Sequence, residues 1–264
     1  MENTALDFEA CYRSYYDRLY RVAYRIAGNR EDAEDALQDA YVSAFRSAKD
    51  FRGQSAPGTW LYRITVNSAL KYIKRRRAFP ISDMARVAGI TEAEFFERLG
   101  DRETVEDTVL TENLRETCLQ MFLECMPRQQ RVAFVLKVLM QLPGSEVAAI
   151  MGISPGAVKT NVYRARQLMV ENLEGRCSLV KKGNPCNCGL WAAYARETGK
   201  ASFFEGPALG RNPRLDYRQL FRSELGFLGK LMALYDVQPQ GTSEDAFLER
   251  MKTLMAEGKL TLLK

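Results

Sequence analysis

Residues 51–77, FRGQSAPGTWLYRITVNSALKYIKRRR, decide the fold, because here a turn-rich loop leads into a helix. The loop segment GQSAPG gathers glycine, serine and proline, the residue types that break regular structure. The sequence predicts that the helix begins at Thr59 and Trp60, with Thr59 capping its first turn. The stretch therefore places an aromatic ring between a polar loop and a helix.

This predicted helix ends in a basic cluster. Its cationic residues are Lys71, Lys74, Arg75, Arg76 and Arg77. A polar loop, an aromatic ring and a cationic helix end can together hold an unpaired nucleic-acid base and its flanking phosphates. A helix with a solvated basic end is the alternative interpretation. The rest of the chain has to decide between the two.

The size and charge of the chain set broad limits. Its 264 residues leave room for two or more small domains. The net charge of +5 is a modest excess that is consistent with a polyanionic partner. No apolar run approaches the ~20 residues that a membrane span needs, and the N-terminus lacks a signal-peptide pattern. We expect a cytoplasmic protein without membrane insertion.

Histidine is absent, which excludes His-based triads, HExxH metal sites and Cys/His zinc fingers. The metal candidates are Cys177, Cys186 and Cys188, because thiolates at that density can bind zinc or form a redox pair. Three ligands fall short of the four that a structural zinc site usually has. We therefore expect free thiols and no cofactor. A thiol-based redox or metal enzyme built on Cys186 and Cys188 is the enzyme alternative.

Two helices are predicted before the opening stretch, over residues 6–27 and 30–49. Apolar and aromatic side chains recur in them at the spacing of one helix face. Gly28 is suited to end the first helix, and Asn29 to cap the second. The face of the second helix opposite its alanines carries Glu31, Asp35, Gln38, Asp39 and Val42.

An acidic segment, TEAEFFERLGDRETVED, follows at residues 91–107. We interpret it as a linker with one short amphipathic helix around Phe95, Phe96 and Leu99. A plain solvated tether is the alternative. A further interpretation is an acidic strand that competes with nucleic acid for a basic channel. Pro80, ahead of this segment, disfavours helix at the junction.

A helix-turn-helix pattern lies between residues 126 and 173. Ser145 is predicted to cap its first helix, and Gly152 lies in the turn. Ser154 is predicted to cap a second helix over residues 155–173. The inward stripe of that helix is Val158, Val162, Ala165 and Met169. Its outward side is polar and can reach base edges or phosphates in a major groove. An ordinary helical hairpin is the alternative.

Two separate motifs resemble one family. Residues 29–45, NREDAEDALQDAYVSAF, followed by residues 51–77, resemble the second conserved region of bacterial RNA polymerase sigma factors. Residues 126–170 are similar to the fourth conserved region. The lack of a third domain between them resembles the extracytoplasmic-function (ECF) group. The resemblance implies an all-α, non-enzymatic protein that binds core RNA polymerase and directs promoter recognition, DNA melting and transcription initiation.

The resemblance also implies a domain organisation. Its parts are region 2 over residues 1–80, an acidic linker over 81–107, a helix-turn-helix region 4 over 108–175 and an extension over 176–264. Some ECF members carry a similar Cys-rich segment just after region 4. The extension should add two amphipathic helices, near residues 217–235 and 245–257, because apolar residues recur there at helical spacing.

Site residues follow from the same resemblance. The residues that would bind core polymerase are Asp35, Gln38, Asp39 and Val42. The residues that would bind the minus-ten element are Arg52, Gln54, Ser55, Trp60, Arg63, Asn67, Lys71, Lys74 and Arg75. The residues that would bind the minus-thirty-five element are Ser154, Lys159, Thr160, Asn161, Tyr163, Arg164 and Arg166. Simple solvation is the alternative for the polymerase-binding face, and a core position is the alternative for Trp60.

Promoter DNA and core polymerase are therefore the expected partners, and an anti-sigma factor is a further partner that the resemblance allows. The alternative function is a polymerase-independent helix-turn-helix DNA-binding regulator. That alternative explains residues 126–173 but leaves residues 29–77 without a role.

Overall fold

A computed structural model describes residues 7–73, 80–100, 108–199, 209–210, 238–239 and 241–258. Helices dominate these residues, which confirms the predicted all-α class. One short ribbon is added by β1 (Leu209–Gly210), which pairs antiparallel with β2 (Gln238–Pro239). The chain divides into two compact units. Unit 1 comprises residues 1–74, 135–159 and 240–264, and unit 2 comprises residues 75–134 and 160–239.

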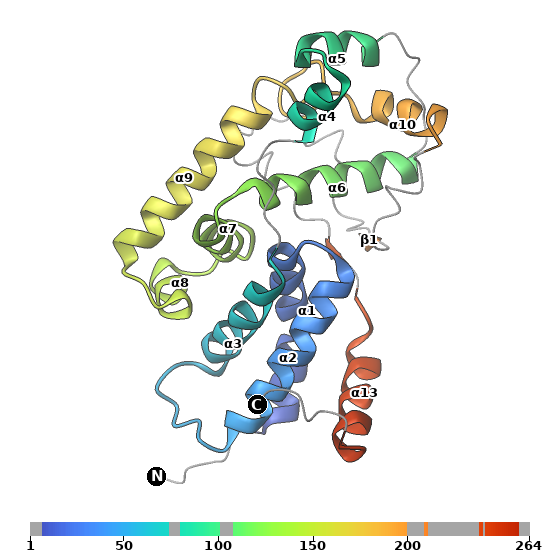
Figure 1. Cartoon of the computed structure of the whole chain (residues 1–264). Coiled ribbons are helices and arrows are strands. Elements are labelled where there is room, and N and C mark those ends of the chain that lie inside the picture. The colour runs from blue at the N-terminus through green and yellow to red at the C-terminus, as the bar shows by residue number, and fades with distance from the viewer. Residues whose placement is uncertain are drawn as a thin grey trace. The chain divides into compact units, whose positions relative to one another are not determined.

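Three helices form the centre of unit 1. They are α1 (Phe8–Ala27), α2 (Arg30–Ala48) and α3 (Pro57–Tyr72), and each packs against the other two (Figure 1). Tyr12 and Leu37 are fully buried between them, and the Tyr12 hydroxyl donates to the Leu37 carbonyl at 3.4 Å. The buried face of α2 is rich in alanine, and these small side chains let the helices approach closely.

The turn between α1 and α2 forms as its sequence predicts. Gly28 ends α1 with a left-handed φ of 115°. The Asn29 side chain accepts a hydrogen bond from the Asp32 amide at 2.9 Å and so caps α2. Both predicted caps are confirmed.

The predicted start of α3 is wrong. The helix begins at Pro57, two residues earlier, after an N-cap Ala56 that makes no side-chain capping bond. Proline suits this first position because its fixed φ is already helical and its missing N–H is not needed there. Thr59 is therefore buried inside the helix, where its hydroxyl donates to Glu146 Oε1 at 2.9 Å.

A close approach between α1 and α3 depends on Gly58. A Cβ at that position would lie 2.6 Å from Cε1 of the Tyr15 ring. The absence of a side chain at Gly58 therefore lets the Tyr15 ring lie directly against the first turn of α3.

Helix α8 (Gly144–Met151) also belongs to unit 1 and packs on α3. It begins after an N-cap Pro143 that makes no side-chain capping bond, so the prediction that Ser145 caps it is wrong. Pro143 is the N-cap itself, whereas Pro57 is the first residue of α3, but in both cases the predicted capping residue lies inside the helix. Gly152 ends α8 with a left-handed φ of 66°.

The second helix of the predicted helix-turn-helix is α9 (Pro155–Leu173), with the bounds that the sequence predicts. The Ala157 amide donates to Ser154 Oγ at 3.1 Å, which confirms the predicted cap. The predicted inward stripe is buried throughout, with exposed fractions between 0% and 6%: Val158, Val162, Ala165 and Met169.

Unit 2 contains α4 (Pro80–Ala88), α5 (Glu92–Gly100), α6 (Thr108–Cys125), α7 (Arg128–Phe134) and α10 (Cys188–Glu197). The structure confirms the short helix predicted in the acidic linker, since α5 buries Phe96 and Leu99. The predictions did not include α4 and α10. Pro80 can open α4, because proline is tolerated in the first turn of a helix and disfavours helix in the residue before it.

Two further elements belong to unit 1. The π-helix η1 (Val135–Leu139) follows α7 directly along the chain. The C-terminal helix α13 (Glu244–Ala256) confirms the second amphipathic helix predicted for the extension. The other predicted helix, near residues 217–235, lies outside the described residues.

Candidate polymerase and nucleic-acid interface

The predicted polymerase-binding residues lie on α2 and differ in their accessibility. Asp35 is exposed, Gln38 and Asp39 are half-buried, and Val42 is buried with 7% of its surface exposed. Because Val42 lies mostly in the core, it can offer a partner only a narrow apolar edge. The accessible part of this face is polar, as suits a detachable protein contact.

Asp39 is tied to the end of α3. Its Oδ2 atom accepts hydrogen bonds from Lys71 Nζ at 3.0 Å and from the Tyr72 hydroxyl at 3.3 Å. Burial, and then the nearby Asp39 carboxylate, raise the pKa of Tyr72 to about 12. In this state the Lys71 ammonium pairs with the Asp39 carboxylate, whereas the sequence interpretation predicts that Lys71 binds a DNA phosphate.

The loop before α3 presents polar side chains to solvent. Arg52 and Gln54 are exposed and Ser55 is half-buried. Behind them the Phe51 ring packs on the Trp60 ring with centroids 5.0 Å apart and planes inclined by 39°. Trp60 is itself half-buried. The ring pair thus forms a firm base under an open loop.

The next turns of α3 expose a row of polar side chains at four-residue intervals: Arg63, Asn67 and Lys71. Side chains at this spacing share one helix face. The Arg63 guanidinium donates to the Ala149 carbonyl of α8 in this state. Lys74 and Arg75, which were predicted to continue the row, lie outside the described residues.

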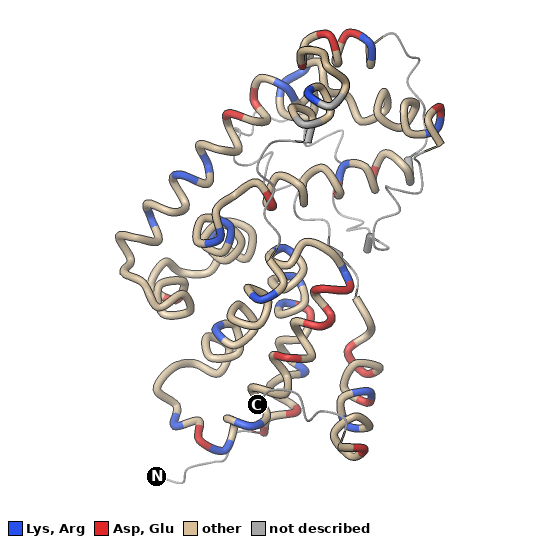
Figure 2. The backbone as a smooth tube through the Cα atoms, viewed as in Figure 1, with Lys and Arg blue, Asp and Glu red and all other residues tan. Residues whose placement is uncertain are grey.

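The outward side of α9 is open to solvent. Lys159, Thr160 and Arg164 are exposed, and the Tyr163 side chain has 62% of its surface exposed. Asn161 and Arg166 are half-buried, and Ser154 is exposed at the cap. Figure 2 shows the cationic positions spaced along this helix, with acidic residues near its C-terminal end. A buried stripe under an exposed cationic face is the form expected of a groove-binding helix.

Unit 2 contains a half-buried group of cysteines, Cys177, Cys186 and Cys188. Cys177 and Cys186 face each other in an isolated parallel bridge, and the Trp191 Nε1–H donates to Cys186 Sγ at 3.3 Å. Burial raises the pKa of Cys186 to about 11 and that of Cys188 to about 12. These directions are opposite to those of a reactive redox thiol, whose pKa is lowered.

Sequence reasoning missed a fourth member of this group. Cys118 of α6 lies near enough to the other three thiols for their charges to add to the effect of burial, and both raise its pKa. All the described cysteines are free thiols. Within the described residues, no three thiol or carboxylate groups are arranged to hold a metal ion.

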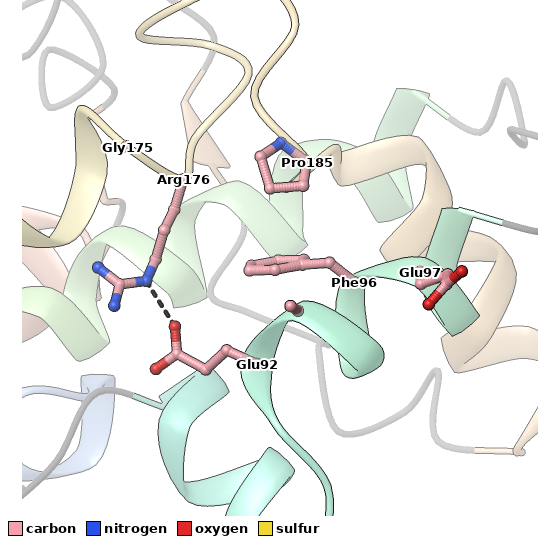
Figure 3. Close-up of a pocket in the computed structure, with 7 residues that line it drawn as sticks. Glu92, Phe96, Glu97, Gly175, Arg176 and Pro185 are labelled. Atoms are coloured by element: carbon pink, nitrogen blue, oxygen red, sulfur yellow. Dashed lines mark hydrogen bonds and ion pairs between the residues drawn. The ribbon is translucent and has the colours of Figure 1, made fainter.

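Unit 2 also holds a pocket of about 560 Å³ beside α5 (Figure 3). Its lining residues are Glu92, Ala93, Phe96, Glu97, Gly175, Arg176 and Pro185. The Arg176 Nε donates to Glu92 Oε2 at 2.8 Å. This bond holds the pKa of Glu92 below its usual value, together with the Ser82 hydroxyl. The pair fastens α5 to the segment after α9.

Comparison with known proteins assigns the chain to a family. Residues 11–79 match the family Sigma-70 region 2, and residues 116–169 match Sigma-70, region 4. The ECF RNA polymerase sigma factor SigW of Bacillus subtilis is 32% identical over 160 residues, which cover 60% of this chain and 84% of SigW. This chain is an ECF sigma factor. The match confirms the resemblance that its sequence motifs carry.

Other relatives agree with this family. The ECF RNA polymerase sigma-E factor of Escherichia coli K12 is 38% identical over 140 residues, which cover 52% of this chain and 71% of that protein. SigE of Mycolicibacterium smegmatis is 31% identical over 164 residues, and the chain spans 59% of its length. All three matches leave more than a third of this ECF sigma factor uncovered, since they cover 61%, 60% and 52% of it.

Two solved structures match the chain more weakly. CnrH in complex with the cytosolic domain of CnrY matches with a TM-score of 0.44 and 22% identity, covering 63% of this chain and 87% of CnrH. RpoE in complex with the anti-sigma factor NepR from Bartonella quintana matches with a TM-score of 0.42 and 20% identity, covering 62% and 95%. Among the described residues of this sigma factor, every helix is too short or too polar to cross a bilayer.

Proposed function

We propose that this ECF sigma factor binds core RNA polymerase through the polar face of α2 and reads promoter DNA with α3 and α9. The observation that carries the proposal is that each of the two family regions has an exposed polar helix face. One is the row Arg63, Asn67 and Lys71 on α3, and the other is the exposed side of α9. A repressor with a single helix-turn-helix would need only the second.

Each surface has a distinct proposed role. Asp35, Gln38 and Asp39 bind core polymerase, with Val42 at the edge of the contact. The loop at Arg52, Gln54 and Ser55 receives an unpaired base over the Phe51–Trp60 ring pair. Asn67 reads that base, because an exposed amide can both donate and accept hydrogen bonds. Arg63, Lys71, Lys74 and Arg75 hold the strand phosphates.

On α9 the proposed roles divide by chemistry. Thr160 and Asn161 lie near the start of the helix, where side chains reach base edges in a major groove. Lys159, Arg164 and Arg166 hold duplex phosphates, while Ser154 and Tyr163 border the contact. This division gives region 4 one set of residues for specificity and another for affinity.

The proposed organisation keeps region 2 at residues 1–80, the linker at 81–107, region 4 at 108–175 and the extension at 176–264. The protein has no catalytic residues of its own in this proposal, and it acts in the cytoplasm with core polymerase and promoter DNA. An anti-sigma factor is a further proposed partner. The raised pKa values of Cys186 and Cys188 speak against the alternative of a thiol redox enzyme.

The decisive experiment combines the purified chain with core polymerase on a promoter from its own regulon, identified by transcript mapping after overexpression. The chain should bind core in a pull-down and support promoter-specific transcription. Arg164→Ala should weaken binding of the upstream duplex, because it removes an exposed phosphate contact. Asn67→Ala should leave that binding unchanged and impair open-complex formation. Failure to bind core, with tight binding of an isolated duplex by the free chain, would favour the polymerase-independent regulator.

A further inference from the structure

The C-terminal helix α13 lies against the region 2 helices, although more than 190 residues separate it from α2 along the chain. We propose that residues 241–257 are a permanent fourth helix of region 2, and that they remain docked when core polymerase occupies the polar face of α2. The second half of this proposal rests on the proposed function. The first half concerns the free chain and stands alone.

The docked face of α13 is apolar and fully covered. Phe247, Leu248 and Met251 have exposed fractions of 5%, 0% and 0%. The Phe247 ring lies 6.2 Å from the Tyr12 ring and stacks on it at 10°, and its centroid is 5.1 Å from that of Tyr16. Burial of this kind on both sides is typical of a domain core rather than of a passing surface contact.

Ion pairs frame this apolar contact on α1. Arg13 Nη1 donates to Glu244 Oε1 at 2.9 Å and also pairs with Asp245. At the other end of α13, Lys252 Nζ lies 2.8 Å from Glu9 Oε1. Since α13 has its acidic residues in the first turn, this pairing defines one direction of the helix along α1.

The segment that leads into α13 is held as closely as the helix. The Tyr16 hydroxyl donates to the Thr242 carbonyl at 2.9 Å, and the Thr242 hydroxyl donates to Glu34 Oε1 at 2.9 Å. A Cβ on Gly241 would clash with Cε2 of the Tyr20 ring, which is only 2% exposed. Glycine is thus needed at this position for the chain to enter the contact.

The docked helix and two of the three polar residues of the proposed polymerase contact, Asp35 and Asp39, use different sides of α2. Glu34 and Tyr41 are the α2 side chains that meet the C-terminal segment. On an α-helix with 3.6 residues per turn, Asp35 and Asp39 lie about 100–160° around the helix from Glu34 and Tyr41. Gln38 lies about one turn from both Glu34 and Tyr41, so it borders the docked segment. Asp35 is exposed in the docked state. The docked helix therefore leaves the Asp35 side of the polar face open, and a partner bound there can coexist with docked α13, with Gln38 at the border of the two contacts.

Hydrogen exchange of the full-length chain tests the docking. Phe247→Ala and Gly241→Ala should each raise exchange about tenfold in α13 and in residues 12–20 of α1, because the segment opens more often. Arg250→Ala is the matched control, since Arg250 lies on the exposed side of the same helix and should leave both rates unchanged. Unchanged exchange in both test variants would overturn the docking.

Reversing the charges of the ion pair provides a control for variants whose exchange rises only because they unfold. Arg13→Glu places like charges opposite Glu244 and Asp245 and should speed exchange in α13. Adding Glu244→Lys and Asp245→Lys to it should restore slow exchange, because the attraction returns with its sign reversed. Failure of the triple variant to recover, with α1 still protected, would contradict the pairing.

Exchange in the complex with core polymerase tests the second half of the proposal. Amides of α13 should stay as protected in the complex as in the free chain. Loss of their protection on core binding would show that α13 is a displaceable cover and would overturn the proposal of a permanent helix. A chain that does not bind core at all would instead refute the proposed function, while the free-chain result would stand.

Discussion

At the scale of single residues, the Glu92–Arg176 pair shows how one contact sets a pH dependence. Arg176 and Ser82 lower the pKa of Glu92, so the folded state favours the carboxylate more than the unfolded chain does. Its stabilisation is fully present above the unfolded pKa of about 4.3 and is lost as pH falls through the lower folded value. Glu92→Gln should therefore cost unit 2 about 0.5 kcal/mol at pH 7 and nothing near pH 2.

Urea unfolding followed by Trp191 fluorescence measures this effect, with Trp60→Phe removing the other tryptophan. Trp191 reports on the right region, because its ring centroid lies 5.6 Å from that of Phe95 in α5. In an Arg176→Gln background, Glu92→Gln should cost much less at pH 7. An equal cost in both backgrounds would assign the effect to burial of the side chain rather than to the ion pair.

The half-buried thiols Cys186 and Cys188 carry a second prediction at this scale. Burial raises the pKa of Cys186 to about 11 and that of Cys188 to about 12. At pH 8 this lowers the thiolate fraction by at least a factor of roughly 100 relative to a free thiol. Alkylation by iodoacetamide, followed by mass spectrometry, should be slow at both cysteines in the folded chain and fast in urea. Equal rates in the two states would contradict their burial as neutral thiols.

At the scale of elements, α9 carries a prediction about salt. Lys159 is exposed on the outward face of α9, where it is proposed to hold a phosphate. Lys159→Ala should weaken duplex binding by the holoenzyme almost equally for all sequences, and it should reduce the slope of log affinity against log salt by about 1. Fluorescence anisotropy at several salt concentrations measures both quantities.

Gln167→Ala is the control for this prediction, because Gln167 is exposed on α9 but uncharged. It should leave the slope unchanged. A lysine variant that loses affinity for one sequence only, with the same slope, would show that Lys159 contacts a base.

The elements also show how far sequence reasoning reaches. Asn29 and Ser154 cap their helices as predicted, because in each case no proline offers an earlier start. Thr59 and Ser145 do not, because Pro57 and Pro143 start those helices sooner. The capping preference is local and was correctly identified, but proline with its fixed φ outweighed it.

Long-range contacts lay beyond the sequence patterns for a different reason. Periodicity predicts that Phe247 belongs to an amphipathic helix, but it does not say which surface covers that helix. The grouping of Cys118 with Cys177, Cys186 and Cys188 has the same origin, since it depends on the packing of α10 on α6. The exposure of the proposed site residues was easier to predict, because exposure follows from the same periodicity, although Val42 is buried.

At the scale of the whole molecule, unit 1 joins segments from three parts of the chain, and this changes what α3 can do. Two hydrogen bonds join α3 to α8: the Arg63 guanidinium donates to the Ala149 carbonyl, and the Thr59 hydroxyl donates to the Glu146 carboxylate. A residue proposed to hold a strand phosphate is thus engaged within the free chain. The Glu146 carboxylate beside it also repels an approaching phosphate.

Removing that carboxylate should favour binding of single-stranded DNA by the free chain. Glu146→Gln keeps a hydrogen-bond acceptor for Thr59 but removes the negative charge, so affinity for a short oligo-dT strand should rise by a factor of about 3. Anisotropy of a labelled strand measures this. Glu174→Gln changes the net charge equally at an exposed position in unit 2 and should have a smaller effect. If the two variants gain equally, net charge alone explains the increase, and α8 does not oppose strand binding at α3.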